Sequence, residues 1–175
     1  MVKPPSVTAV VLAYGAEPWL LECVGSVLGS TGVQVEVVLV DNGCTSDVVE
    51  ELSVWPRVTV LRPESNVGFA GGVGLGAKGV TTDFIAMVNS DAVVDESALA
   101  ALAAEAGRDD VGIASACLVL GDQPHLVNSV GNPVHLLGFA WAGDSAMRSK
   151  HIHWQRMSPA LRGPAQSSER HGGKH

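Results

Sequence analysis

Two aspartates follow apolar segments of this chain, and their positions are its strongest chemical signal. Residues 84–95 read FIAMVNSDAVVD, a buried-strand pattern that ends in a polar turn containing Asp91. Residues 35–40 read VEVVLV and lead directly into Asp41. Ligands of open α/β sheets bind just outside the carboxyl ends of the strands. If these strands are neighbours, both carboxylates open onto one crevice, where they suit a divalent cation or the imide and hydroxyl groups of a nucleotide. Alternatively, each aspartate merely caps the turn after its strand.

A glycine-rich stretch offers a second kind of site. Residues 66–79 read NVGFAGGVGLGAKG and contain six glycines. Residues 74–79 match the G-x-G-x-x-G pattern of dinucleotide-binding folds, but that pattern needs a strand directly before its first glycine. Here the nearest apolar run, residues 58–61, ends well before it. The glycines otherwise allow the backbone to approach a bulky anionic ligand, or a helix to pack tightly on the sheet.

Other reactive side chains give weaker signals. Tyr14 ends the first apolar segment, where its ring suits either stacking on a base or an ordinary place at the edge of the core. His151 and His153 form a His-x-His pair without an acid or cysteine at a fitting spacing, which favours tail histidines in solvent over a metal site. No nucleophile-elbow pattern is present.

Strands that alternate with helices must position these residues. The apolar runs predict strands at 7–14, 35–40, 58–61, 84–88 and 111–119. The helical periods predict helices at 19–28, from Thr45 or Ser46 to Leu52, within 66–79 and at 96–106. Residues 120–147 read as loop because of their Gly and Pro breakers. This order predicts a three-layer α/β/α sandwich with a mostly parallel central sheet and right-handed crossovers.

The composition is that of a globular protein. The chain has 175 residues, of which 46% are hydrophobic and 17% charged, which excludes a disordered chain. No apolar stretch reaches the roughly 18 residues that a membrane-spanning helix needs. The three cysteines are scattered and without CxxC spacing, so they favour a reducing cytoplasm and give no zinc motif.

The charge is unevenly spread, and this sets the predicted domain boundary. Residues 148–175 hold six of the eleven Lys and Arg residues and one acid, Glu169. We therefore predict one domain at 1–147 and a basic, flexible tail at 148–175. The alternative for the tail is a basic patch for an anionic membrane surface or nucleic acid.

Four segments in order resemble family 2 glycosyltransferases, and among them most closely the bacterial rhamnosyltransferase-like members. The segments begin at Val7 (VTAVVLAYGAEPWLLECVGSVLGS), Val35 (VEVVLVDNGCTSD), Leu61 (LRPESNVGFAGGVGLGAKG) and Asp83 (DFIAMVNSDAVVD). The resemblance runs from about residue 7 to residue 140. It implies the nucleotide-diphospho-sugar transferase fold, called GT-A, and an inverting transferase of polysaccharide or cell-wall biosynthesis.

The resemblance also implies roles for individual residues. Ala13 and Tyr14 would line the nucleobase pocket, and Asp41 would contact the uracil or thymine ring of a UDP- or dTDP-linked sugar. The segment from Asn66 to Gly72 would lie along the ribose and the diphosphate, with Gly68, Gly71 and Gly72 as its contact glycines. Asp91 would bind a divalent metal, Mg²⁺ or Mn²⁺, that bridges the diphosphate.

This chain departs from the family pattern at three motif positions. Asn89 stands where the first acid of the Asp-x-Asp motif is usual, which leaves one carboxylate for the metal. Cys44 replaces a usual serine, and Val73 replaces a usual asparagine.

The largest departure concerns the general base. Family members take it from an acidic motif in a downstream acceptor-binding half, and neither Asp122 nor Asp144 has the matching context. We therefore expect a chain that keeps the donor half and lacks the acceptor half, and a non-catalytic remnant that only binds a nucleotide sugar remains the alternative. The partners expected are a nucleoside-diphosphate sugar and a saccharide or lipid-linked acceptor, without nucleic acid. The place expected is the cytoplasm, with peripheral contact at the inner face of the membrane.

Overall fold

The computed structural model describes residues 3–129. Those residues divide between two compact units, one ending at Ser115 and the other beginning at Ala116. The predicted boundary at residue 147, the His151–His153 pair and the basic tail lie outside the described residues.

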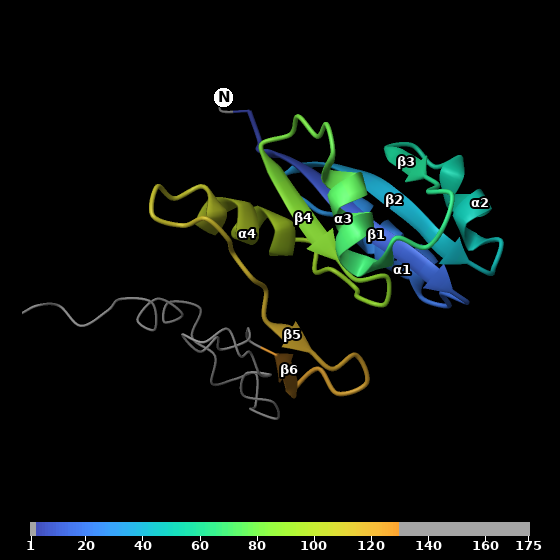
Figure 1. The fold of residues 1–175 in the computed structure, drawn as a ribbon. Coiled ribbons are helices and arrows are strands. Elements are labelled where there is room, and N and C mark those ends of the chain that lie inside the picture. Colours follow the sequence, from blue (N-terminus) through green and yellow to red (C-terminus); the bar gives the residue numbers. More distant parts are fainter. Residues whose placement is uncertain (1–2, 130–175) are drawn as a thin grey trace, which may run out of the picture. The chain divides into compact units, whose positions relative to one another are not determined.

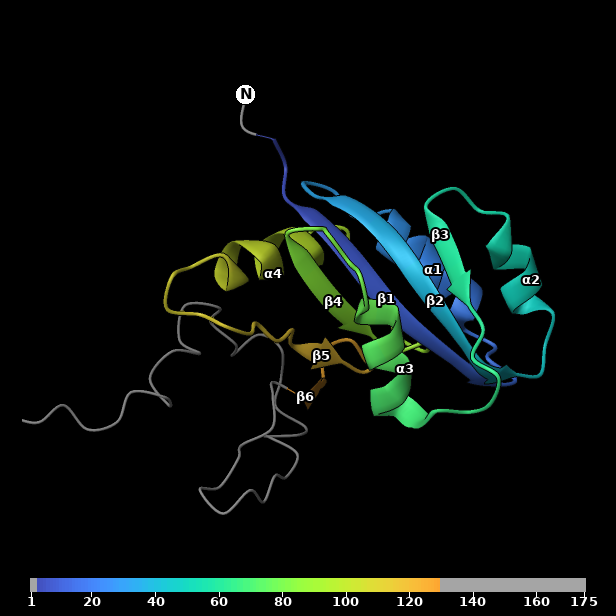
Figure 2. The same cartoon turned by 45° about the horizontal axis from the view of Figure 1, so that its top comes forward.

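A four-stranded parallel sheet forms the centre of the first unit (Figures 1 and 2). Its strands are β1 (Ser6–Gly15), β2 (Gln34–Cys44), β3 (Val58–Leu61) and β4 (Phe84–Val88). They lie in the order β3-β2-β1-β4, and every pair is parallel. The near-continuous apolar runs of these strands are typical of sheets covered on both faces.

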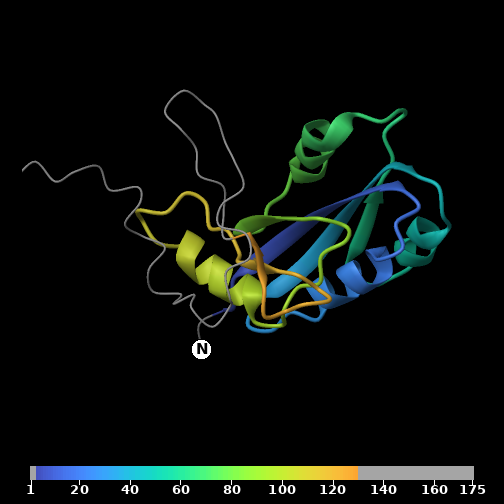
Figure 3. The same cartoon turned by 90° about the horizontal axis from the view of Figure 1, so that it is seen from below.

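The helices cover the two faces unequally. Figure 3 shows α3 (Gly68–Ala77) on one face of the sheet. The other face carries α1 (Leu20–Leu28), α2 (Val48–Ser53) and α4 (Ala98–Ala106). The predicted three-layer α/β/α sandwich with a parallel central sheet is therefore confirmed.

The core lies mainly between the sheet and the three helices on one face. Leu20 and Val24 of α1 are fully buried against strand residues such as Val11 and Leu39. Leu99 of α4 belongs to the same buried cluster. Removal of this apolar surface from water is the main term that stabilises the unit.

The second strand is longer than predicted, and the difference changes the site. The strand was predicted to end at Val40, just before Asp41, whereas β2 continues to Cys44. Ala13 stays paired with Asp41 and Gly15 with Cys44, and a register shift between them absorbs the extra residue. Gly43 adopts a φ of 112°, which a side chain would disfavour. The Asp-Asn-Gly sequence therefore forms a bulge in the strand.

The strand predicted at 111–119 is wrong for residues 111–117, and only its last two residues form a strand. Residues 111–115 form no strand, and Ile113 is 86% exposed. The alternating positions are small, Gly112, Ala114 and Ala116, so they bury little surface and favour a strand poorly.

The second unit, as far as it is described, is a short hairpin. Strand β5 (Leu118–Val119) lies at the end of the strand predicted for 111–119, and it pairs antiparallel with β6 (Val127–Ser129), which falls within residues predicted to be loop.

Candidate functional site

A cavity of about 550 Å³ lies at the carboxyl ends of the central strands of the first unit. One side is formed by the end of β1 and the turn after it: Leu12, Tyr14, Ala16, Glu17 and Pro18. Another comes from the end of β4 and the turn after it: Val88, Asn89, Ser90 and Asp91. Between them, β2 and the start of α3 contribute Asn42, Asn66, Gly68 and Phe69.

The topology explains why the cavity forms there. The chain passes from β1 to β2 to β3 along one edge of the sheet, and then returns to β4 on the other side of β1. The helix after β1 therefore lies on one face, and the helix before β4 lies on the opposite face. The two connections diverge beyond the strand ends, and such a switch point is where open α/β sheets bind ligands.

Tyr14 presents its ring to this cavity. The side chain is 65% exposed, so it is not an ordinary residue of the core. Its ring lies beside Gly43, where an added Cβ would be 3.5 Å from Tyr14 Cδ2. Its backbone N–H donates to Glu17 Oε1 over 2.7 Å. Gly15 and Glu17 both have positive φ, 77° and 45°, so the turn after β1 is tightly curved. An exposed aromatic face at a cavity suits stacking against a planar ligand.

Asn42 organises the middle of the site, although its sequence context did not single it out. The residue is only 4% exposed, and its Oδ1 accepts a hydrogen bond from Val67 N over 2.9 Å. Its Nδ2 donates to Asn66 Oδ1 over 3.0 Å and to Gly68 O over 3.4 Å. The amide therefore ties the end of β2 to the start of α3. The signal that could have identified it is a polar residue inside a buried strand, since such groups are kept where they are hydrogen-bonded.

Asp91 and Asn89 lie together at the cavity, as the strand-end argument predicts. Asn89 follows β4 directly, and Asp91 is two residues further on, exposed to solvent. The thiol of Cys23, on α1, donates to Asn89 O over 3.3 Å. Burial raises the pKa of this thiol to about 12, opposed by a hydrogen bond from Ala92 N–H and reinforced by the negative charges of Asp91 and Glu17. Cys23 therefore keeps its proton and remains a donor at neutral pH.

The oxygen atoms at this cavity fit a hard cation that takes its remaining ligands from a phosphate. Among the described residues, no cluster of three or more His, Cys, Asp or Glu side chains could hold a metal unaided. Mg²⁺ needs only one or two protein carboxylates when phosphate oxygens and waters complete its shell. The Asp91 carboxylate, with the amide oxygen of Asn89 nearby at the same cavity, meets that lesser requirement.

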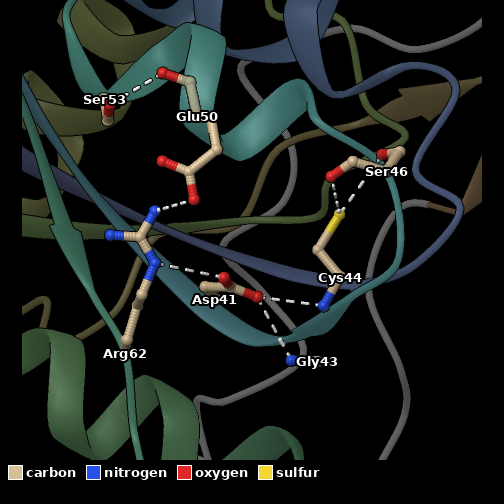
Figure 4. Close-up of polar contacts among 7 residues, drawn as sticks. All are labelled: Asp41, Gly43, Cys44, Ser46, Glu50, Ser53 and Arg62. Atoms are coloured by element: carbon tan, nitrogen blue, oxygen red, sulfur yellow. Dashed lines mark hydrogen bonds and ion pairs between the residues drawn. The ribbon is translucent and has the colours of Figure 1, made fainter.

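Asp41 does not share this cavity, and the predicted convergence of residues 41 and 91 on one pocket is wrong in this respect. Because β2 continues past it, Asp41 and Asn42 point to opposite faces of the sheet. Figure 4 shows Asp41 accepting from the backbone N–H groups of Gly43 and Cys44, at 3.3 and 2.9 Å. Its other oxygen pairs with Arg62 Nε at 3.4 Å, and Arg62 also pairs with Glu50 of α2 at 2.8 Å.

Three other predicted contact residues serve packing. Ala13 is fully buried in the cluster beneath α1. A Cβ at Gly72 would overlap the side chain of Leu12, and one at Gly71 would lie 3.1 Å from Val67 Cβ. None of the three lines the cavity, whereas Asn66 and Gly68 do.

The G-x-G-x-x-G match belongs to the packing of α3. Gly74 and Gly76 lie inside the helix, so no strand precedes the pattern and the dinucleotide interpretation is wrong. A Cβ at Gly76 would overlap Val10 and lie 3.2 Å from Val40 Cγ2. The glycine lets α3 approach the sheet closely.

Glu17 and Ser90 also line the cavity, and their sequence context predicted no role for them. Phe69 lines it too and belongs to the segment from Asn66 to Gly72 that the family resemblance assigned to the ribose and the diphosphate. Phe69 is 62% exposed, which is unusual for a large apolar side chain next to a cavity. No periodic pattern marks these residues, because they lie in turns and at a helix start.

A family model and several curated relatives match this chain. The family model described as "Glycosyl transferase family 2" matches residues 8–137. "Glycosyltransferase GlyG" of Streptococcus pneumoniae serotype 4 is 28% identical over 130 residues, which is 72% of this chain and 42% of that protein. The "Succinoglycan biosynthesis protein ExoO" of Rhizobium meliloti is 35% identical over 95 residues, which is 53% of this chain and 27% of that protein. The chain thus spans less than half the length of these relatives.

Solved structures share the fold. S. aureus TarS 1-349, solved in complex with UDP, superposes with a TM-score of 0.51 and 24% identity over 58% of this chain and 32% of that one. The mannosyltransferase PcManGT of Pyrobaculum calidifontis, solved with GDP-Man and Mn²⁺, gives a TM-score of 0.55 and 19% identity over 62% of this chain and 35% of that one. The predicted GT-A-like architecture is confirmed by these likenesses.

Proposed function

The chain belongs to glycosyl transferase family 2, and on this premise we propose that its cavity binds a nucleoside-diphosphate sugar for transfer, with inversion, to a saccharide or lipid-linked acceptor. The observation that carries the proposal is the meeting of Tyr14, Asn66, Asn89 and Asp91 around one cavity at the switch point of the sheet. The two structural neighbours support it, since one was solved with UDP and the other with GDP-Man and Mn²⁺.

The nucleobase end of the donor is assigned to the side of the cavity formed by β1. The exposed ring of Tyr14 offers a face on which a pyrimidine can stack. Asp41 lies one residue from the lining residue Asn42, and contact between its carboxylate and a pyrimidine imide would require it to leave its ion pair with Arg62. The expected donors are UDP- and dTDP-linked sugars.

The diphosphate is assigned to the start of α3 and the turn after β4. Gly68 and Phe69 are the first residues of α3 and line the cavity. A helix N-terminus favours anions, because its first N–H groups lack partners within the helix and carry partial positive charge. Gly68 N–H donates to Asn66 Oδ1 over 2.7 Å, and a Cβ added at Gly68 would meet no atom within 4 Å, which leaves room for the phosphate oxygens.

Asp91 is assigned as the carboxylate that holds the divalent cation, Mg²⁺ or Mn²⁺, and Asn89 as its neutral neighbour. When bound, the cation would offset the charge that develops on the departing nucleoside diphosphate. Asp91 would anchor the diphosphate end, while Tyr14 orients the base end. Because a single carboxylate contributes, metal affinity is expected to depend strongly on the nucleotide.

The acceptor side lies outside these assignments. Inversion needs a general base that removes the proton of the acceptor hydroxyl, and none of the described cavity residues is assigned that role. We place the acceptor at a membrane surface, because residues 148–175 carry six of the eleven basic residues and would contact anionic lipid headgroups.

Calorimetry with UDP and with dTDP, each with and without Mn²⁺, tests the proposal. Substitution of the carboxylate, Asp91→Asn, is expected to weaken metal-dependent binding by about tenfold or more. Mutation of residues that only hydrogen-bond to a metal ligand already lowers metal affinity by about that factor. The matched control is Asp109→Asn, an exposed carboxylate outside the cavity lining. Binding that ignores both Mn²⁺ and Asp91 would contradict the assignment. Turnover of the nucleotide sugar by the same chain would separate transfer from donor binding alone.

A further inference from the structure

The connection between β4 and α4 depends on α1 for its shape. This connection, residues 89–97, carries Asn89 and Asp91 but belongs to no helix or strand. Its backbone is attached at three points: at Cys23 and Ser26 of α1, and at Thr31, whose backbone N–H donates to Glu96 O over 2.7 Å.

The first attachment lies inside the turn that carries Asp91. The Cys23 side chain is fully buried, and its thiol donates to Asn89 O over 3.3 Å. The same carbonyl accepts from Ala92 N over 3.1 Å. The thiol therefore bonds to the carbonyl that closes a four-residue turn, from Asn89 to Ala92, in which Asp91 is the third residue.

The second attachment continues from the first. Ser26 Oγ donates to Cys23 O over 2.8 Å and accepts from Val94 N over 3.0 Å. Residues three apart lie on the same face of a helix, so Cys23 and Ser26 present their polar atoms to consecutive parts of the connection. The backbone on both sides of Asp91 is thereby held by α1, which is itself anchored in the core.

We propose that Cys23 and Ser26 are positioning residues for Asp91, which hold its carboxylate where a nucleotide-bound cation can use it. This inference rests on the proposed function of the cavity. A single exposed carboxylate in an irregular turn would otherwise have to be ordered by the ligand, at a cost in affinity. Ligand groups must be held within about 0.5 Å of the working geometry, and that is the task of partners behind them.

If Cys23 only packed in the core, its variants would behave differently from those of a positioning residue. Three variants separate the packing role from the positioning role. Cys23→Ala removes the donor and leaves a small void. Cys23→Ser keeps a donor at nearly the same place. Val27→Ala also leaves a void under α1, but Val27 has no polar atom, and it is equally buried.

The experiment measures Mn²⁺ binding to the full chain in the presence of UDP, by electron paramagnetic resonance of the free ion, together with UDP binding without metal. We expect Cys23→Ala and Ser26→Ala to weaken Mn²⁺ binding by about tenfold while metal-free UDP binding stays unchanged. Cys23→Ser should recover most of the loss, and Val27→Ala should bind Mn²⁺ as the parent chain does. Hydrogen exchange at the amides of Ala92 and Val94 should accelerate in Cys23→Ala and Ser26→Ala but not in Val27→Ala.

The outcomes are distinguishable. If the parent chain binds no UDP and no Mn²⁺, the proposed function is wrong and the positioning role falls with it. If the parent binds Mn²⁺ through Asp91 but Cys23→Ala binds it equally well, only the positioning role is overturned. Equal losses in Cys23→Ala and Val27→Ala would also overturn it, because packing alone would then account for the effect.

Discussion

At the scale of residues, the composition of the site depends on which of two neighbouring strand residues, Asp41 or Asn42, faces the cavity. Asp91 lies where its place after an apolar strand predicts. Asp41 has the same sequence context, yet its neighbour Asn42 lines the cavity, because β2 continues through both and alternates its side chains. Asp41 instead accepts two backbone N–H groups and pairs with Arg62, as a turn-capping aspartate does.

The buried amide of Asn42 leads to a prediction about both stability and binding. Asn42→Ala would leave Val67 N–H and the start of α3 without their partner, and such losses cost about 1–3 kcal/mol. The loss of its bonds to Asn66 and Gly68 should also weaken UDP binding. Thermal unfolding and calorimetry measure the two effects. The exposed Asn128→Ala is the control, and an Asn42→Ala chain as stable as this control would contradict the role assigned to the amide.

At the scale of elements, α3 shows how a motif can be read correctly as glycine-rich and wrongly as a dinucleotide fingerprint. The glycines at 72 and 76 face the sheet, where a side chain would meet Leu12 and Val10. Gly74 faces away, and a Cβ added there would meet no atom within 4 Å. The same residue type therefore has opposite consequences two residues apart.

A matched pair of substitutions tests this arrangement. Gly76→Ala should destabilise the chain by about 1–3 kcal/mol, because the methyl group overlaps Val10 and overpacks the interface. Gly74→Ala should stabilise it by about 0.5–1 kcal/mol, because alanine costs less conformational entropy in an open position of a helix. Urea unfolding of both variants gives the two free energies. Destabilisation of similar size in both would show that α3 does not pack as described.

At the scale of the whole molecule, the uneven distribution of charge along the chain has no role in the donor site. The formal net charge is −7, yet residues 148–175 hold six basic residues and one acid. Within residues 3–129, no helix is long and apolar enough to cross a membrane. The membrane contact proposed above rests on the basic segment.

Neutralisation of that segment is the corresponding test. A chain with Gln in place of the six Lys and Arg residues at 148–175 should lose sedimentation with vesicles that contain anionic lipid, since each basic residue contributes about 1 kcal/mol near such a surface. The binding of the parent chain should also fall as salt is raised, because the attraction is screened. Neutral phosphatidylcholine vesicles are the control. Unchanged binding by the neutralised chain would contradict membrane contact through this segment.

The sequence by itself determined the four strands of the parallel sheet, its covering helices and the place of Asp91 after the fourth strand. Apolar runs and helical periods are local signals, and a strand end in a parallel sheet points to the binding edge whatever lies beside it. Only the tertiary structure decided that β2 continues past Asp41, that Asn42 and Glu17 line the cavity, and that Cys23 supports the turn of Asp91. The physical reason is that these outcomes depend on strand pairing and on contacts between residues up to 66 positions apart, which no local pattern records.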